Sequence, residues 1–171
     1  MNIFDQLVIP ASSNHILLIE YMLIISLILF IPYIGMLLGG MFISTYFNKK
    51  GKQEGNSLYT RFAEDVINKL TISGNAKFGL GVIPAISIFF AYAQLLYTTK
   101  SISLGMMALA MLLFFLSLTF VYKYRDMFKL ERMLSQINYT GSIGKYLLLT
   151  AVYIFAGSMA LASSPDNWNS V

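Results

Sequence analysis

Four long runs of apolar residues divide the chain. They cover residues 16–47, 78–97, 102–122 and 146–162, and polar segments separate them. A helix needs about 20 apolar residues to cross the hydrocarbon core of a bilayer, and the four runs meet or approach this length. The pattern predicts an all-α fold: an integral membrane bundle of four transmembrane helices that forms a single membrane domain over residues 1–171.

The polar segments set the order of these helices. Residues 48–77 and 123–145 form long connections, whereas residues 98–101, with the sequence TTKS, are short enough for a tight turn. Two helical hairpins are therefore expected, the first built from spans one and two and the second from spans three and four.

Each long connection contains a stretch with helical periodicity. Apolar residues recur about every four positions within residues 57–70 and again within residues 127–137, and charged residues lie between them. Each stretch predicts an amphipathic cytoplasmic helix that either lies at the lipid interface or packs under the bundle, and Ser57 is the expected N-cap of the first. The apolar stripes are Leu58, Phe62, Val66 and Leu70 in the first stretch and Met127, Leu130, Leu134 and Ile137 in the second.

The two hairpins also invite comparison with each other. When Lys77 is aligned with Lys145, several residues of similar type coincide in the preceding stretches. Parallel duplication of this kind occurs in membrane proteins, but two unrelated amphipathic helices that end in a boundary lysine would align as well. Both interpretations stay open at the level of sequence.

Positive charges indicate how the bundle is oriented. Of the twelve lysine and arginine residues, six lie in residues 48–77 and five in residues 123–145, and Lys100 is the remaining one. Lysine and arginine are retained in short cytoplasmic loops. Both long connections should therefore be cytoplasmic, and both termini should lie outside a bacterial cytoplasmic (inner) membrane. Aromatic residues at the ends of the spans fit interfacial anchors, namely Tyr21, Tyr97, Tyr122 and Tyr146.

Composition agrees with membrane insertion and excludes several kinds of chemistry. Hydrophobic residues make up 57% of the chain, charged residues 12%, and the mean hydropathy is +0.66, beyond the roughly half-apolar usage of soluble domains. The net charge of +4 is not concentrated in a dense tract, so lipid is the expected neighbour and nucleic acid is not. With no cysteine in the chain, disulfides, thiolate zinc sites, iron–sulfur clusters and a covalent haem motif are excluded within it.

Ionisable groups inside membranes mark functional sites, and this chain offers few. His15, its single histidine, and Glu20 lie near the outer end of the first span. One interpretation makes His15 a ligand of haem b iron or of quinone and Glu20 a proton-relay carboxylate. The other makes both interfacial residues. Five residues correspond to about 500° of helical rotation, so the two side chains should not share a face.

Gln94 is the third candidate for cofactor binding. It lies near the outer end of the second span, where its amide requires hydrogen-bonding partners. We expect it to join helices, to bind a partner subunit or to contact a quinone head group.

Proline and glycine interrupt the first span. Pro32 removes one backbone hydrogen bond, so a bend is expected there. Gly35 and Gly39, with Gly40 beside them, allow close approach of another helix. Pro84 in the second span lies at a similar depth, so we predict a packing seam here for the second span or for a partner subunit.

Three short motifs follow one another in the first half of the chain. They are Phe30, Pro32, Gly35 and Met36, then the sequence RFAEDVINKL, then residues 81–84. Their order resembles the start of the large subunit of cytochrome bd-type quinol oxidases and related membrane electron-transfer subunits. It departs from the family at Leu27, where the axial histidine is expected, and in the third span, which has no carboxylate. What the resemblance implies is a related scaffold in a respiratory complex, without the haem site of the oxidase.

These observations lead to one principal hypothesis and two alternatives. The principal hypothesis is a membrane subunit or anchor of a respiratory electron-transfer complex, not catalytic on its own, that contacts quinone or a periplasmic c-type cytochrome. The C-terminal sequence SSPDNWNSV either ends the protein or leads to a periplasmic domain of that type. The alternatives are a cofactor-free structural or assembly protein with a membrane or periplasmic protein partner, and a small transporter component.

Overall fold

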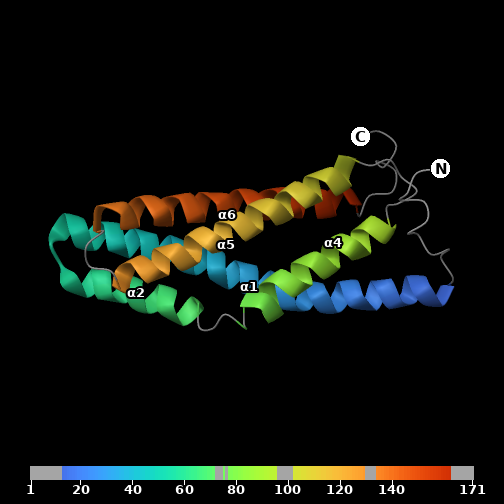
Figure 1. Cartoon of the computed structure of the whole chain (residues 1–171), viewed down its shortest axis with the longest axis horizontal. Coiled ribbons are helices and arrows are strands. Elements are labelled where there is room, and N and C mark those ends of the chain that lie inside the picture. Colours follow the sequence, from blue (N-terminus) through green and yellow to red (C-terminus); the bar gives the residue numbers. More distant parts are fainter. Residues whose placement is uncertain (1–12, 72–74, 76, 96–101, 130–133, 163–171) are drawn as a thin grey trace.

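Every element of the computed structural model is a helix (Figure 1). The structure describes residues 13–71, 75, 77–95, 102–129 and 134–162, and no strand occurs among them. The all-α prediction is therefore confirmed for this part of the chain. The elements are α1 (Ser13–Glu54), α2 (Ser57–Leu70), the π-helix η2 (Lys77–Val82), α4 (Ile83–Leu95), α5 (Ile102–Lys129) and α6 (Leu134–Ala162).

Four of the helical stretches are long and apolar enough to cross a membrane. They are Asn14–Glu54, Lys77–Gln94, Leu104–Phe128 and Gln136–Ala160, and each contains most of one predicted span. Large apolar side chains point outward along them: Ile28 is 65% exposed, Leu112 63% and Tyr153 80%. Soluble monomers rarely expose contiguous apolar surface of this extent. The four apolar helices therefore indicate a multi-pass membrane protein with a surface suited to lipid.

Aromatic contacts fix the centre of the bundle. The ring of Phe30 on α1 lies 5.3 Å from that of Phe114 on α5 and 5.2 Å from that of Phe155 on α6, measured between centroids. All three side chains are buried. Because offset and edge-to-face aromatic pairs stabilise packing beyond their buried area, this cluster holds α1 against the α5–α6 pair.

The first helix is longer than predicted. The span was expected to end at residue 47, but α1 continues to Glu54 and contains 42 residues, about 63 Å at 1.5 Å per residue. Its polar end is stabilised by an ion pair between Lys50 and Glu54 at 3.8 Å, a spacing that supports a helix. The first residues of the long connection over residues 48–77 are thus helical.

A sharp turn joins α1 to α2. Gly55 has a φ of 65°, a conformation that glycine adopts at little cost. The side chain of Asn56 then accepts a hydrogen bond from the backbone N–H of Leu58 at 3.0 Å. The N-cap of α2 is therefore Asn56, and the prediction of Ser57 was wrong by one residue.

The α2 helix folds back along the second half of α1 (Figure 1). Its bounds match the predicted amphipathic helix, but its buried face is formed by Ala63 and Ile67. Of the predicted stripe, Leu58 is 68% exposed and Phe62 46% exposed. The small side chain of Ala63 lets the α2 backbone lie close to α1. The buried face of α2 is therefore shifted by one position from the predicted stripe.

The described residues of the second predicted amphipathic stretch belong to the end of α5 and the start of α6. Met127 belongs to α5 and Ile137 to α6, and both are buried; Leu130 lies outside the described residues. The apolar periodicity here continues that of the adjoining spans, so it did not reveal the helix ends. The two aligned stretches differ in the bounds of their described helices, because Lys77 opens η2 whereas Lys145 lies within α6.

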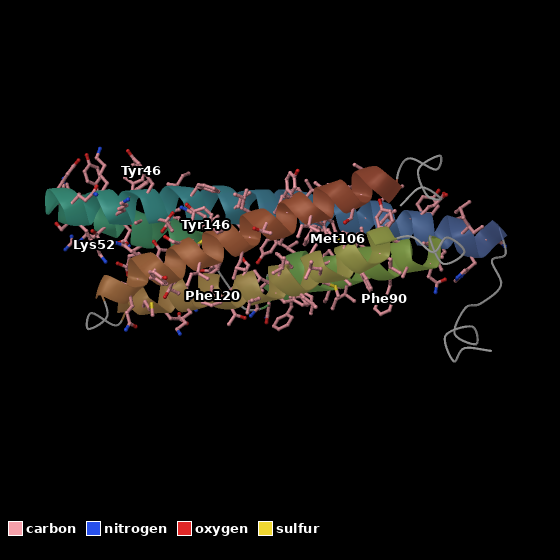
Figure 2. The ribbon with its side chains drawn as sticks, turned by 90° about the horizontal axis from the view of Figure 1, so that it is seen from above. Tyr46, Lys52, Phe90, Met106, Phe120 and Tyr146 are labelled. Atoms are coloured by element: carbon pink, nitrogen blue, oxygen red, sulfur yellow. The ribbon has the colours of Figure 1, made fainter. Side chains whose placement is uncertain are left out.

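The bundle consequently has two distinct ends. We call the end formed by α2, the end of α1, the end of α5 and the start of α6 the basic end, because the described lysine and arginine residues lie there or at its border. Ser13 and Ala162 lie at the opposite end (Figure 1), which we call the terminal end. In Figure 2, Lys52 lies near the basic end and Phe90 towards the terminal end.

The predicted glycine seam is only partly realised. The α1 helix is continuous through Pro32, and a Cβ at Gly35 or Gly39 would meet no described atom within 4 Å. These two glycines therefore do not join helices within the described chain. Gly40 does, because a Cβ there would collide with Leu70 of α2.

Pro84 of the predicted seam lies at a change of helix type. It is buried and follows directly on the start of α4, where the π-helix η2 ends. Proline has no N–H to donate to a preceding turn, so the change of helix type falls where that bond is missing. Close packing occurs just before it, since a Cβ at Gly81 would lie 2.6 Å from Cε1 of Tyr33 on α1.

We predict that Gly141→Ala destabilises the bundle whereas Gly157→Ala in the same helix does not. A Cβ at Gly141 would lie 2.7 Å from Cε2 of the buried Tyr124 ring, but a Cβ at Gly157 would meet no described atom within 4 Å. Overpacking of this kind costs about 1–3 kcal/mol, while alanine is a better helix former than glycine. Thermal unfolding of both variants in the same detergent tests this, and equal melting temperatures would contradict it.

Candidate functional site

Two of the three predicted site residues meet at the terminal end. His15 lies in the first turn of α1 and Gln94 in the last turn of α4. The His15 Nε2 and the Gln94 Oε1 are 3.3 Å apart, although 79 residues separate them in the chain. Since α1 and α4 pack against each other in opposite directions (Figure 1), the start of one helix is brought beside the end of the other.

A small pocket lies below this polar pair. Its volume is about 180 Å³, and its apolar walls come from one face of each helix: Leu18, Ile19 and Met22 of α1 and Phe90 and Ala91 of α4. Ligand pockets of drug-sized molecules are commonly about 300–1,000 Å³. The pocket is smaller than these, and His15 and Gln94 supply its polar lining.

Glu20 does not take part in this pocket. Its side chain is exposed, and it is not among the lining residues. The structure therefore brings together His15 and Gln94 but separates Glu20 from them, as the helical rotation between His15 and Glu20 predicts.

A larger groove lies at the other end of α4, at the border of the basic end. It has a volume of about 700 Å³ and is bounded by η2 and the start of α4 on one side and by α5 on the other. Its apolar wall includes Val82, Phe115 and Leu118, and its polar residues are Lys77, Thr119, Tyr122, Lys123 and Asp126. We refer to it as the α4–α5 groove.

Tyr122 organises the charged groups of this groove. The Lys77 Nζ lies 4.5 Å from the centroid of its ring and the Arg125 Cζ 4.9 Å, distances at which a cation is attracted to an aromatic face. The Tyr122 side chain is also hydrogen-bonded to that of Tyr33 on α1. The ring is thus contacted by η2 through Lys77, by α1 through Tyr33, and by Arg125 of its own helix.

Arg125 fixes the basic end to the groove. Its Nη1 donates to the carbonyl of Thr71, just after α2, at 3.1 Å, and its Nε and Nη2 donate to Asp126 Oδ1 at 2.9 and 2.8 Å. Both nitrogens share one carboxylate oxygen, and the Asp126 side chain is half exposed. Asp126 is therefore paired with its neighbour Arg125 at the edge of the groove.

The sequence pattern did not predict this groove. In the sequence, Lys77 and Lys123 count among the positive charges that indicate orientation, and Tyr122 fits an interfacial anchor. A usable signal was present, because antiparallel spans two and three place the start of one and the end of the other at the same depth. Two lysines and a tyrosine at those two positions lie on facing ends of neighbouring helices.

A third polar cluster is buried inside the basic end. The Ser44 hydroxyl donates to the carbonyl of Ala63 at 2.7 Å and is hydrogen-bonded to the Tyr124 hydroxyl at 3.0 Å. The Asn48 Nδ2 donates to the Asn138 Oδ1 at 2.6 Å, whereas the buried Asn48 Oδ1 has no donor among the described residues. These contacts link α1 to α2, α5 and α6, which is a structural role.

Metal ligands and comparisons with known proteins add no further indication of function. No group of three or more histidine, aspartate or glutamate residues that could hold a metal ion occurs in the described part of the chain. Comparison of the sequence and structure with protein-family models, curated proteins and solved structures gives no match.

We predict that Asn138→Leu destabilises the protein and that adding Asn48→Leu restores much of the loss. The single change leaves the buried Asn48 amide without its acceptor, at a cost of about 1–3 kcal/mol. The double change removes both polar groups, which is close to neutral for a buried pair. Unfolding of the two variants measures this, and a double variant no more stable than the single one would contradict it.

Proposed function

We propose that this chain is a membrane subunit or anchor of a respiratory electron-transfer complex and that it binds a quinone head group at its terminal end. The observation that carries the proposal is the meeting of His15 and Gln94 at the rim of an apolar pocket. A quinone ring is flat and apolar and carries carbonyl oxygens. An imidazole N–H and a primary amide are donors suited to such oxygens.

The size of the pocket favours quinone over haem b. A volume of about 180 Å³ suits one small ring and is too small for a porphyrin. The pocket walls on α1 and α4 are part of the surface suited to lipid, so an isoprenoid tail has a path into the bilayer. Quinone would supply the redox chemistry, while His15 and Gln94 would bind and orient its head group.

The proposed orientation places the terminal end outside a bacterial cytoplasmic membrane. The support is the concentration of lysine and arginine at and near the basic end, since these residues are retained on the cytoplasmic side. In this orientation the quinone pocket faces the periplasmic side. A c-type cytochrome there is the partner to which a subunit of this kind would pass electrons.

A cofactor-free structural or assembly protein is the second candidate. The same contact favours it, because the hydrogen bond with His15 already gives the Gln94 amide a partner and joins α1 to α4. Polar groups that join helices in this way are common in membrane bundles. A transporter is disfavoured, since the spans carry no charged side chain between Glu20 and Lys49, in residues 83–95, or in residues 102–122 and 146–162.

Photolabelling with an azido-naphthoquinone tests the quinone pocket. On the full-length chain in nanodiscs, label should appear in residues 15–22 and 90–94 and be displaced by unlabelled naphthoquinone. His15→Ala and Gln94→Leu should each reduce labelling about three- to tenfold, the value of one lost hydrogen bond. Leu18→Trp should reduce it by filling the pocket while leaving both polar groups in place.

Glu20→Gln is the matched control, because it alters a polar group of the same helix outside the pocket, and it should leave labelling unchanged. If none of the pocket variants altered labelling, the quinone proposal would be overturned and the structural or assembly role would remain. Reduced-minus-oxidised spectra separate the haem alternative: the quinone proposal expects no haem b band, and a band that His15→Ala abolishes would overturn it.

Single cysteines test the orientation, since the natural chain has none. Asn14 and Gln53 are exposed and lie near opposite ends of α1. In intact cells, a membrane-impermeant thiol reagent applied outside should label Asn14→Cys, and it should label Gln53→Cys only after lysis. The reverse pattern would overturn the proposed orientation.

A further inference from the structure

The α4–α5 groove changes in polarity along its length. Phe115 and Leu118 line its apolar part, Thr119 and Tyr122 follow within one turn of α5, and Lys123 lies at its charged end. Phe115 and Lys123 are eight residues apart, about 12 Å along the helix. The groove therefore passes from apolar to basic in the way that a lipid molecule passes from acyl chain to head group.

The charged end of the groove has an excess of positive charge. Lys77 and Lys123 both line it, and the one carboxylate there, that of Asp126, is held by Arg125 at 2.8 Å. Two lysines against one paired carboxylate leave the lining with a net positive charge. The groove is complementary to a phosphate group.

The packing of the helices leaves this groove open to the surroundings. The α5 helix packs extensively on α6 but much less on α4, and Phe78 at the groove edge is 52% exposed. The wide π-helical turn of η2 begins at Lys77 and sets this residue opposite the end of α5. An amphiphile can therefore enter sideways from a bilayer.

We propose that the α4–α5 groove is a binding site for one anionic phospholipid. The phosphate group binds at Lys77 and Lys123, and an acyl chain lies along Phe115 and Leu118. The site rests on the proposed insertion of the four helices in a bilayer and not on quinone binding, which concerns the opposite end of α4. Basic pockets between transmembrane helices commonly bind such head groups.

A second basic groove is smaller and less apolar. It lies between α1 and α6, has a volume of about 320 Å³, and contains Lys49 and Lys145. Its remaining lining consists of Thr45, Asn138 and Ser142 and the aromatic residues Phe42, Tyr46 and Tyr146. Its volume is less than half that of the α4–α5 groove and its lining is less apolar, so the α4–α5 groove is better suited to hold an acyl chain.

Photoactivatable lipids test the proposal on the full-length chain in nanodiscs of equal phosphatidylglycerol and phosphatidylcholine content. Analogues of both lipids carry the reactive group in the acyl chain, and the labelled peptides are identified by mass spectrometry. Phosphatidylglycerol should label residues 115–127 well above phosphatidylcholine. Lys77→Gln and Lys123→Gln should each reduce this preference about fivefold, the value of one basic residue near the membrane surface.

Two further variants separate specific from general attraction. Lys69→Gln removes the same charge from an exposed position of α2 that does not line the groove, and the preference should persist. Thr119→Trp fills the groove without altering its charge, and labelling by both lipids should fall there. On the natural chain, high salt should reduce the preference for phosphatidylglycerol in the groove. Labelling of the His15 pocket by the azido-naphthoquinone should persist.

Three results would overturn the lipid site. Equal labelling by the two lipids would remove the role of the phosphate charge. If Lys69→Gln lowered the preference for phosphatidylglycerol as much as Lys77→Gln, the preference would reflect general attraction of the lipid to a positive surface. Displacement of the label by millimolar inorganic phosphate would show that the groove binds a free anion and not a lipid.

Discussion

The length of α1 is the constraint on which the other elements depend. This 42-residue helix contacts α2, η2, α4 and α6, and none of these covers it alone. Over its first half it packs against α4, and over its second half against α2. The helix is continuous through Pro32 and passes through both environments, so one element sets the positions of the terminal end and the basic end.

The shortness of α4 accounts for the positions of both candidate sites. Together η2 and α4 span Lys77–Leu95. They are shorter than α1 and α5, so both of their ends lie beside these longer helices. At one end Gln94 reaches the start of α1 and closes a small pocket. At the other end Lys77 meets the last turns of α5, and the limited contact between α4 and α5 leaves the larger groove.

Buried polar contacts hold the basic end as an extension of the bundle. Ser44 reaches both Ala63 and Tyr124, and Asn48 reaches Asn138. Hydrogen bonds of this kind are specific in distance and direction, so they fix how α2 and the ends of α5 and α6 sit against α1. The close approach at Gly141 lies in the same region, where only glycine leaves room for the Tyr124 ring.

The sequence by itself determined the helical class, the number of apolar spans and the bounds of α2, because these follow from local periodicity and from runs of apolar residues. It also singled out His15 and Gln94, since polar groups are rare in apolar spans. It did not determine which glycines pack, where α5 ends and α6 begins, or that Lys77, Tyr122 and Lys123 share a groove. Those features depend on the rotation of each helix about its axis and on contacts between residues far apart in the chain, such as Gly40 with Leu70 and Gly81 with Tyr33. The tertiary structure decided them because side chains on neighbouring helices must fit one another in shape, a condition that the pattern along a single helix does not contain.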